Sequence, residues 1–79
     1  MAFVFSKHAL EQMELRGISK IVVEEILENP QKIKEEKGIN VYQSVAGKFL
    51  IRIFVNEKKN PKLIITVYKT SQIKKYHES

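Results

Sequence analysis

The stretch KFLIRIFVN, residues 48–56, has the residue types and the alternation of a β-strand. Branched and aromatic side chains favour extended backbone, and successive side chains of a strand point to opposite faces of the sheet. One face then carries Phe49, Ile51, Ile53 and Val55, and the other carries Leu50, Arg52, Phe54 and Asn56. The pattern predicts that Arg52 projects from the face opposite the main core, among apolar neighbours, where a cation needs an anion.

Three further stretches after Pro30 show the same period of two. QKIKEEKG reads as a weak, charged edge strand, INVYQSV as the strand before a tight turn, and KLIITVYK as the last strand; they span residues 31–38, 39–45 and 62–69. On the last strand we expect Leu63, Ile65 and Val67 on one face and Ile64, Thr66 and Tyr68 on the other. This succession favours an antiparallel meander.

Before Pro30 the apolar residues repeat at helical spacing instead. FSKHALEQMELRGIS, residues 5–19, predicts a helix that begins after the N-cap Ser6 and ends before Gly17. We expect Leu10 on its inward face. A second helix follows the N-cap Ser19 and stops at Pro30, because the residue before a proline avoids the helical conformation.

The predicted fold is α+β, with residues 1–79 forming a single domain. Two N-terminal helices pack on one face of a four-stranded antiparallel sheet, and a short C-terminal turn or helix, capped by Thr70 or Ser71, follows the last strand. The other face is partly apolar, so something must cover it. The alternatives are the terminal segment through Ile73 and Tyr76, a homodimer partner or a ligand, and only residues 77–79 look dispensable.

The net charge is +5, and the two parts of the chain differ in sign. The first thirty residues carry three cations against five glutamates, a net charge of −2, so the remainder carries +7. A basic surface of this kind suits a polyanion such as RNA, although lysine-rich solvated strands are also common. With no cysteine, no signal-peptide pattern and no long apolar run, we expect a soluble cytoplasmic protein that does not enter a membrane.

Most catalytic classes lack the residues they need. The only histidines are His8 and His77, without carboxylates at ligand spacing, and there is no aspartate for a catalytic triad. The three glycines, at 17, 38 and 47, do not form a phosphate-binding loop. We therefore expect no metal and no cofactor, which leaves chemistry that needs only acids, bases and cations.

Metal-independent RNA cleavage is such a reaction, because the 2′-hydroxyl attacks its own phosphate. His8 lies at the start of the first helix, whose dipole favours the neutral, basic imidazole, although a histidine there is more often structural. Arg52 needs either Glu35 or Glu36 as a structural partner or a phosphate from a ligand. Tyr68 and Tyr76 can stack on bases or transfer a proton, or simply pack. Further candidates for holding phosphate are Lys69, Thr70, Lys74 and Lys75.

Four segments together, FSKHALEQMELRGIS, VEEILENPQKI, VYQS and TVYKTSQIKKY, resemble the small bacterial family grouped as domain of unknown function 4258. The likeness covers roughly residues 5–76. That family is thought to be distantly similar to toxins of the RelE and BrnT type, within the barnase, EndoU and colicin-like ribonuclease fold, which implies two helices on an antiparallel sheet. By this resemblance the positions to carry over are His8, Arg52, Tyr68 and Thr70.

The resulting hypothesis is a toxin-type, metal-independent endoribonuclease that acts on RNA. In it His8 is the base or acid, Arg52 and the terminal lysines hold phosphate, and Tyr68 or Tyr76 places a base. The alternative is a module that binds RNA or a protein on the same basic face without cleaving, and a homodimer is compatible with both. An antitoxin is a further expected partner. Catalytic activity, RNA target and oligomeric state stay open, because a fold does not determine a function.

Overall fold

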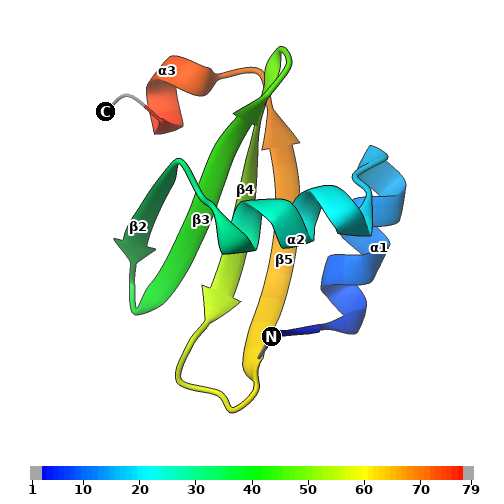
Figure 1. Ribbon diagram of the computed structural model, residues 1–79, viewed down its shortest axis with the longest axis vertical. Coiled ribbons are helices and arrows are strands. Elements are labelled where there is room, and N and C mark those ends of the chain that lie inside the picture. Colours follow the sequence, from blue (N-terminus) through cyan, green and yellow to red (C-terminus); the bar gives the residue numbers. More distant parts are fainter. Residues whose placement is uncertain (1–2, 78–79) are drawn as a thin grey trace.

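The computed structural model describes residues 3–77, in which five strands and three helices occur. In chain order these are β1 (Phe3–Phe5), α1 (Lys7–Arg16), α2 (Lys20–Glu28), β2 (Lys32–Glu36), β3 (Ile39–Ala46), β4 (Phe49–Asn56), β5 (Lys62–Thr70) and α3 (Ile73–Tyr76). Figure 1 shows α2 crossing the strands and α1 lying beside β5.

The strands form one mixed sheet in the order β1-β5-β4-β3-β2. β1 pairs with β5 in parallel, while the other neighbours are antiparallel. The predicted four-stranded antiparallel sheet with two N-terminal helices is therefore wrong, although the α+β class stands. The added strand, FVF, has only three residues, too few to show the alternation by which the others were found.

Both predicted N-caps are confirmed. Ser6 Oγ accepts a hydrogen bond from the backbone N–H of Ala9 at 3.0 Å, and Ser19 Oγ accepts one from Val22 at 3.2 Å. Gly17 ends α1 with φ 66°, a left-handed conformation that glycine adopts without steric cost. These local signals fix where α1 and α2 begin and where α1 ends.

A β-bulge in β5 changes which residues face the helices. Phe54 pairs with Thr66, but Val55 pairs with Ile64, so one extra residue, Ile65, interrupts the alternation. Ile64 consequently lies fully buried in the helix-side core with Val67. Its predicted place on the outer face was wrong, because that prediction assumed an uninterrupted strand.

The main core lies between the two long helices and the sheet. Its buried members are Ala9, Met13, Ile18, Val23, Ile26, Leu27, Tyr42, Ile51, Ile53, Val55, Ile64 and Val67. Leu10 was expected there but is 48% exposed. On the opposite, outer face of the sheet, Val41 and Leu50 are buried beside the polar residues Gln43 and Arg52, so that face also has a covered centre.

Candidate functional site

A row of four polar side chains crosses the outer face at one register. Lys32 pairs with Gln43, Gln43 with Arg52, and Arg52 with Tyr68, so β2, β3, β4 and β5 each contribute one residue. Adjacent strands lie about 4.8 Å apart, which gives the row a length of roughly 14 Å. We call these four residues the polar row.

Arg52 is 3% exposed and its guanidinium has three side-chain partners. Nε donates to Gln43 Oε1 at 3.1 Å, Nη1 to the Tyr68 hydroxyl at 2.9 Å, and Nη2 to Glu36 Oε2 at 2.6 Å. Burial alone would lower the pKa of Arg52, but the hydrogen bonds to Tyr68 and Glu36 raise it above its ordinary value. Of the two carboxylates considered from the sequence, Glu36 is the one that forms the ion pair.

The C-terminal segment covers this face, as expected from Ile73 and Tyr76. The Tyr76 ring centroid lies 4.5 Å from the Arg52 guanidinium carbon, and 6.3 Å from the Tyr68 ring. The segment begins at Thr70, whose hydroxyl oxygen accepts a hydrogen bond from the Gln72 N–H at 3.1 Å. The prediction that Thr70 or Ser71 caps this helix was wrong, because the N-cap of α3 is Gln72 and no side chain bonds there, so the Thr70 hydroxyl stabilises only the turn before it.

Backbone carbonyls at the end of α3 bind side chains of β2 and β3. The Tyr76 carbonyl accepts hydrogen bonds from Lys34 Nζ and from Gln43 Nε2, the latter at 3.0 Å, and the His77 carbonyl accepts one from Lys32 Nζ. The His77 ring nitrogen Nδ1 also lies 3.0 Å from Gln43 Nε2. The prediction that His77 is dispensable was therefore wrong, while residues 78 and 79 lie outside the described residues.

The neighbours of Tyr76 favour the deprotonated form of its phenol. A hydrogen bond with Tyr68 and the nearby Lys75 ammonium lower the pKa of Tyr76 below its ordinary value. Lys75 Nζ lies 5.2 Å from the Tyr76 ring centroid. The Tyr76 hydroxyl thus releases its proton more readily than an isolated tyrosine, which suits a group that transfers protons.

The other residues predicted for the site divide between the two faces. Lys69 turns to the helix side, where its Nζ lies 4.9 Å from the Phe49 ring centroid, so it does not border Arg52. Lys74 and Lys75 are exposed on α3. His8 is exposed in the first turn of α1 and contacts none of the polar row among the described hydrogen bonds, ion pairs and ring contacts.

Sequence reasoning missed Gln43, Lys32 and Lys34, and it did not connect Arg16 with the site. Gln43 is fully buried on β3 and bonds both Arg52 and the end of α3. Arg16, at the end of α1, places its guanidinium carbon 5.9 Å from the Tyr68 ring centroid. The signal that could have found Gln43 is a buried glutamine that pairs across strands with a buried arginine. This signal can be used only when the strand pairing is known.

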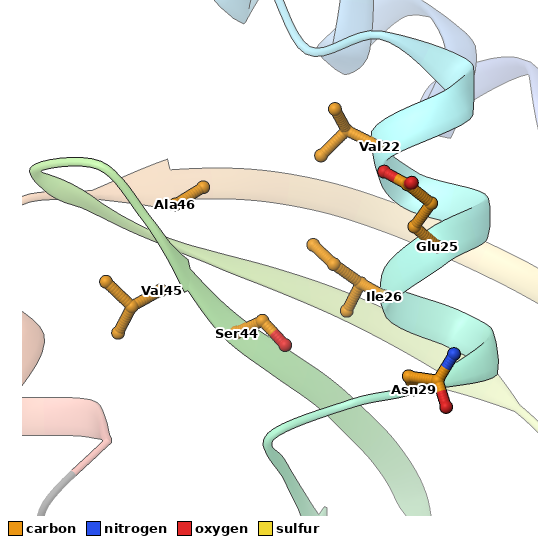
Figure 2. A pocket seen from close by; sticks show the side chains of 7 residues that line it. All are labelled: Val22, Glu25, Ile26, Asn29, Ser44, Val45 and Ala46. Atoms are coloured by element: carbon orange, nitrogen blue, oxygen red, sulfur yellow. The ribbon is translucent and has the colours of Figure 1, made fainter.

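A groove lies on the opposite, helix side of the sheet. Figure 2 shows this groove, of about 450 Å³, between α2 and the end of β3. Its lining is Val22, Glu25, Ile26, Asn29, Ser44, Val45 and Ala46. Glu25 is the only titratable side chain in that lining, which mixes polar and apolar residues. In the described part of the chain no group of three histidine, cysteine or acidic residues is placed to hold a metal ion.

The chain belongs to the family described as Domain of unknown function (DUF4258), whose model matches residues 5–69. Comparison with curated proteins gave no match, and neither did comparison with solved structures. Among residues 3–77, none of the helices has both the length and the apolar character that a membrane crossing requires.

Proposed function

We propose that this member of the DUF4258 family binds RNA on the outer face of its sheet, in the cytoplasm. The observation that carries the proposal is the combination of cations and aromatic rings around Arg52. Phe54 stacks on Tyr68 with ring centroids 5.9 Å apart, and Tyr76 meets Tyr68 edge-on. Aromatic rings stack on bases and cations attract phosphates, so the face offers both kinds of contact that single-stranded RNA uses.

The rim of this face supplies accessible charge. Arg16, Lys74 and Lys75 are exposed around Tyr68 and Tyr76. The glutamates of α2 lie with that helix on the other side of the sheet. RNA is therefore expected to approach the face that carries α3 rather than the face that carries α2.

The test is fluorescence anisotropy of a labelled single-stranded RNA at several salt concentrations. We expect the double substitution Lys74→Gln and Lys75→Gln to weaken binding and to reduce the salt slope by about 1.4, the value for two phosphate contacts on a single strand. The matched control is Lys58→Gln with Lys59→Gln, two exposed adjacent lysines in the turn between β4 and β5. Equal weakening by both pairs would mean that only the net charge of the protein attracts RNA, and it would contradict the proposal.

A second candidate function is metal-independent cleavage of the bound RNA, as the toxin-type hypothesis requires. It is favoured by the lowered pKa of Tyr76 beside the cation Arg52. Tyr76, as the phenolate, would accept the proton of the 2′-hydroxyl as that oxygen attacks the phosphate. The P–O5′ bond then breaks, the 5′-oxygen leaves with the proton that Tyr76 has gained, and a 2′,3′-cyclic phosphate remains, while Arg52 would stabilise the charge that develops on the phosphate. This candidate assigns the proton transfer to Tyr76 in place of His8.

Incubation with RNA in EDTA tests this second function. We expect Tyr76→Phe to lower the cleavage rate about 100-fold or more, the usual contribution of a general base, and His8→Ala to leave it unchanged. Cleavage that survives Tyr76→Phe, or that stops with His8→Ala, would refute this assignment. Binding without any cleavage by the wild-type protein would leave the chain as a binding module.

A further inference from the structure

We propose that the polar row is an anion site for the phosphate groups of RNA, and that α3 occupies this site as an autoinhibitory strap. The inference rests on the proposed RNA binding, which it deepens by naming the groups that are bound and the segment that competes. It does not rest on cleavage by Tyr76, because displacement of the strap carries Tyr76 away from Arg52. We use the name strap for residues 71–77.

The end of the strap places backbone carbonyl oxygens against hydrogen-bond donors of the outer face. The carbonyl oxygens of Tyr76 and His77 receive hydrogen bonds from Lys34, Gln43 and Lys32. Two ammonium groups and an amide N–H₂ thus converge on carbonyls at the end of a helix, the end that carries partial negative charge. Phosphate oxygens accept hydrogen bonds from the same donors, with a full charge in place of a partial one.

The cation beneath the strap is built into the fold. Arg52 and Gln43 are 3% and 0% exposed, and the hydrogen bonds that Arg52 donates to Gln43, Tyr68 and Glu36 do not involve the strap. Tyr76 covers the Arg52 guanidinium. Displacement of the strap would therefore uncover a preorganised guanidinium that stays paired with Glu36, and it would release Lys32 and Lys34, which have no such carboxylate partner among the described ion pairs, from the carbonyls at the same time.

The helix within the strap contributes little to holding the strap in place. Helix α3 has four residues, none of them buried, and no side-chain hydrogen bond at its N-cap. A single helical turn is not stable by itself, so α3 depends on its contacts with the sheet. Local opening of such a segment costs less free energy than unfolding of the core, which leaves the sheet intact while the strap is open.

Phosphate binding and strap docking exclude each other because they use the same donors. The apparent affinity for phosphate is then the intrinsic affinity reduced by the fraction of molecules with an open strap. By reciprocity, a bound phosphate must favour the open strap to the same extent. Both directions of this coupling are measurable.

The probe is inorganic pyrophosphate, and its binding is followed by the NMR signal of the Arg52 Nε–H group. Ile73→Gly weakens the strap without altering the polar row, and we expect it to bind pyrophosphate about tenfold more tightly than the wild type does. Ile21→Gly, at an exposed position of α2, is the matched control and should not change the affinity. Adding Lys32→Gln to Ile73→Gly should remove the gain.

The wild-type protein provides a second measurement. The His77 N–H donates to the Ile73 carbonyl at 2.8 Å, so its hydrogen exchange reports on α3. Saturating pyrophosphate should accelerate that exchange about tenfold. Unchanged exchange at saturation, or equal pyrophosphate affinity in the wild type and Ile73→Gly, would overturn the strap proposal. If Ile73→Gly gains pyrophosphate affinity but binds no RNA, the strap proposal stands and the proposed RNA function falls.

Discussion

Arg52 donates hydrogen bonds to side chains from three other strands, so its removal affects β2, β3 and β5 together. We predict that Arg52→Met lowers the free energy of unfolding by about 3 kcal/mol, because the buried Gln43 loses its donor and Tyr68 loses a partner. Arg52→Lys should also be costly, since an ammonium lacks the planar fork that reaches three acceptors.

Urea denaturation measures this loss. The control is Lys48→Met at an exposed position in the β3–β4 turn, where the change should stay within about 0.5 kcal/mol. A loss below about 1 kcal/mol for Arg52→Met would show that the outer face does not depend on this residue.

Tyr42 gives the protein a defined sensitivity to alkaline pH. Burial and a hydrogen bond to Glu57 raise the pKa of Tyr42 from 10.0 to about 12. Because the folded state holds this proton more tightly than the unfolded chain, the stabilisation is fully present below pH 10 and is lost as the pH rises towards 12.

We therefore predict that the free energy of unfolding falls by about 2 kcal/mol more in the wild type than in Tyr42→Phe across this pH interval, at 1.36 kcal/mol per pKa unit. Denaturation curves of the two proteins at pH 9 to about 12 provide the measurement. Parallel pH profiles for the two proteins would mean that the Tyr42 proton is not held by the fold.

The candidate site shows what residue patterns can and cannot predict. The need of Arg52 for an anion followed from one cation at an internal strand position, and Glu36 was among the partners considered. The polar row did not follow, because Lys32 and Gln43 join Arg52 only through the pairing of three strands. The register of strand pairing cannot be predicted from any single segment, since it depends on contacts between strands.

At the scale of elements, Ser6 links α1 to the bulge of β5. Its hydroxyl accepts from the Ala9 N–H and donates to the Ile65 carbonyl at 2.8 Å, whereas the hydroxyl of Ser19 serves α2 alone. We predict that Ser6→Ala costs about 2 kcal/mol of stability and Ser19→Ala about 1 kcal/mol or less. Thermal or urea unfolding measures the pair, and equal losses would mean that the bond to Ile65 contributes nothing.

The bulge in β5 and the pairing of β1 could not be predicted from the sequence, whereas most helices and strands could. The helices and the strands from β2 to β5 were predictable because caps and alternation are local signals. The bulge was not, because Ile64, Ile65 and Thr66 are all compatible with a regular strand. It is stabilised by the distant Ser6, which donates to the Ile65 carbonyl across 59 positions in the sequence. The parallel pairing of β1 is equally long-range.

For the whole molecule, the sheet separates two surfaces with different chemistry. The helix side has a groove of mixed polar and apolar residues bordered by the acidic helix α2 (Figure 2), while the outer side has the polar row, the aromatic rings and the strap. RNA is expected on the outer side rather than on the helix side, because phosphates are repelled by glutamates and attracted by lysine and arginine.

Binding of RNA to the outer face can be followed residue by residue in an NMR titration of the full chain with single-stranded RNA. We expect the largest shift changes at Lys32, Gln43, Arg52, Tyr68 and the strap. Changes that instead cluster at Val22, Ile26 and Ala46 in the groove, or no changes at low salt, would contradict RNA binding on the outer face.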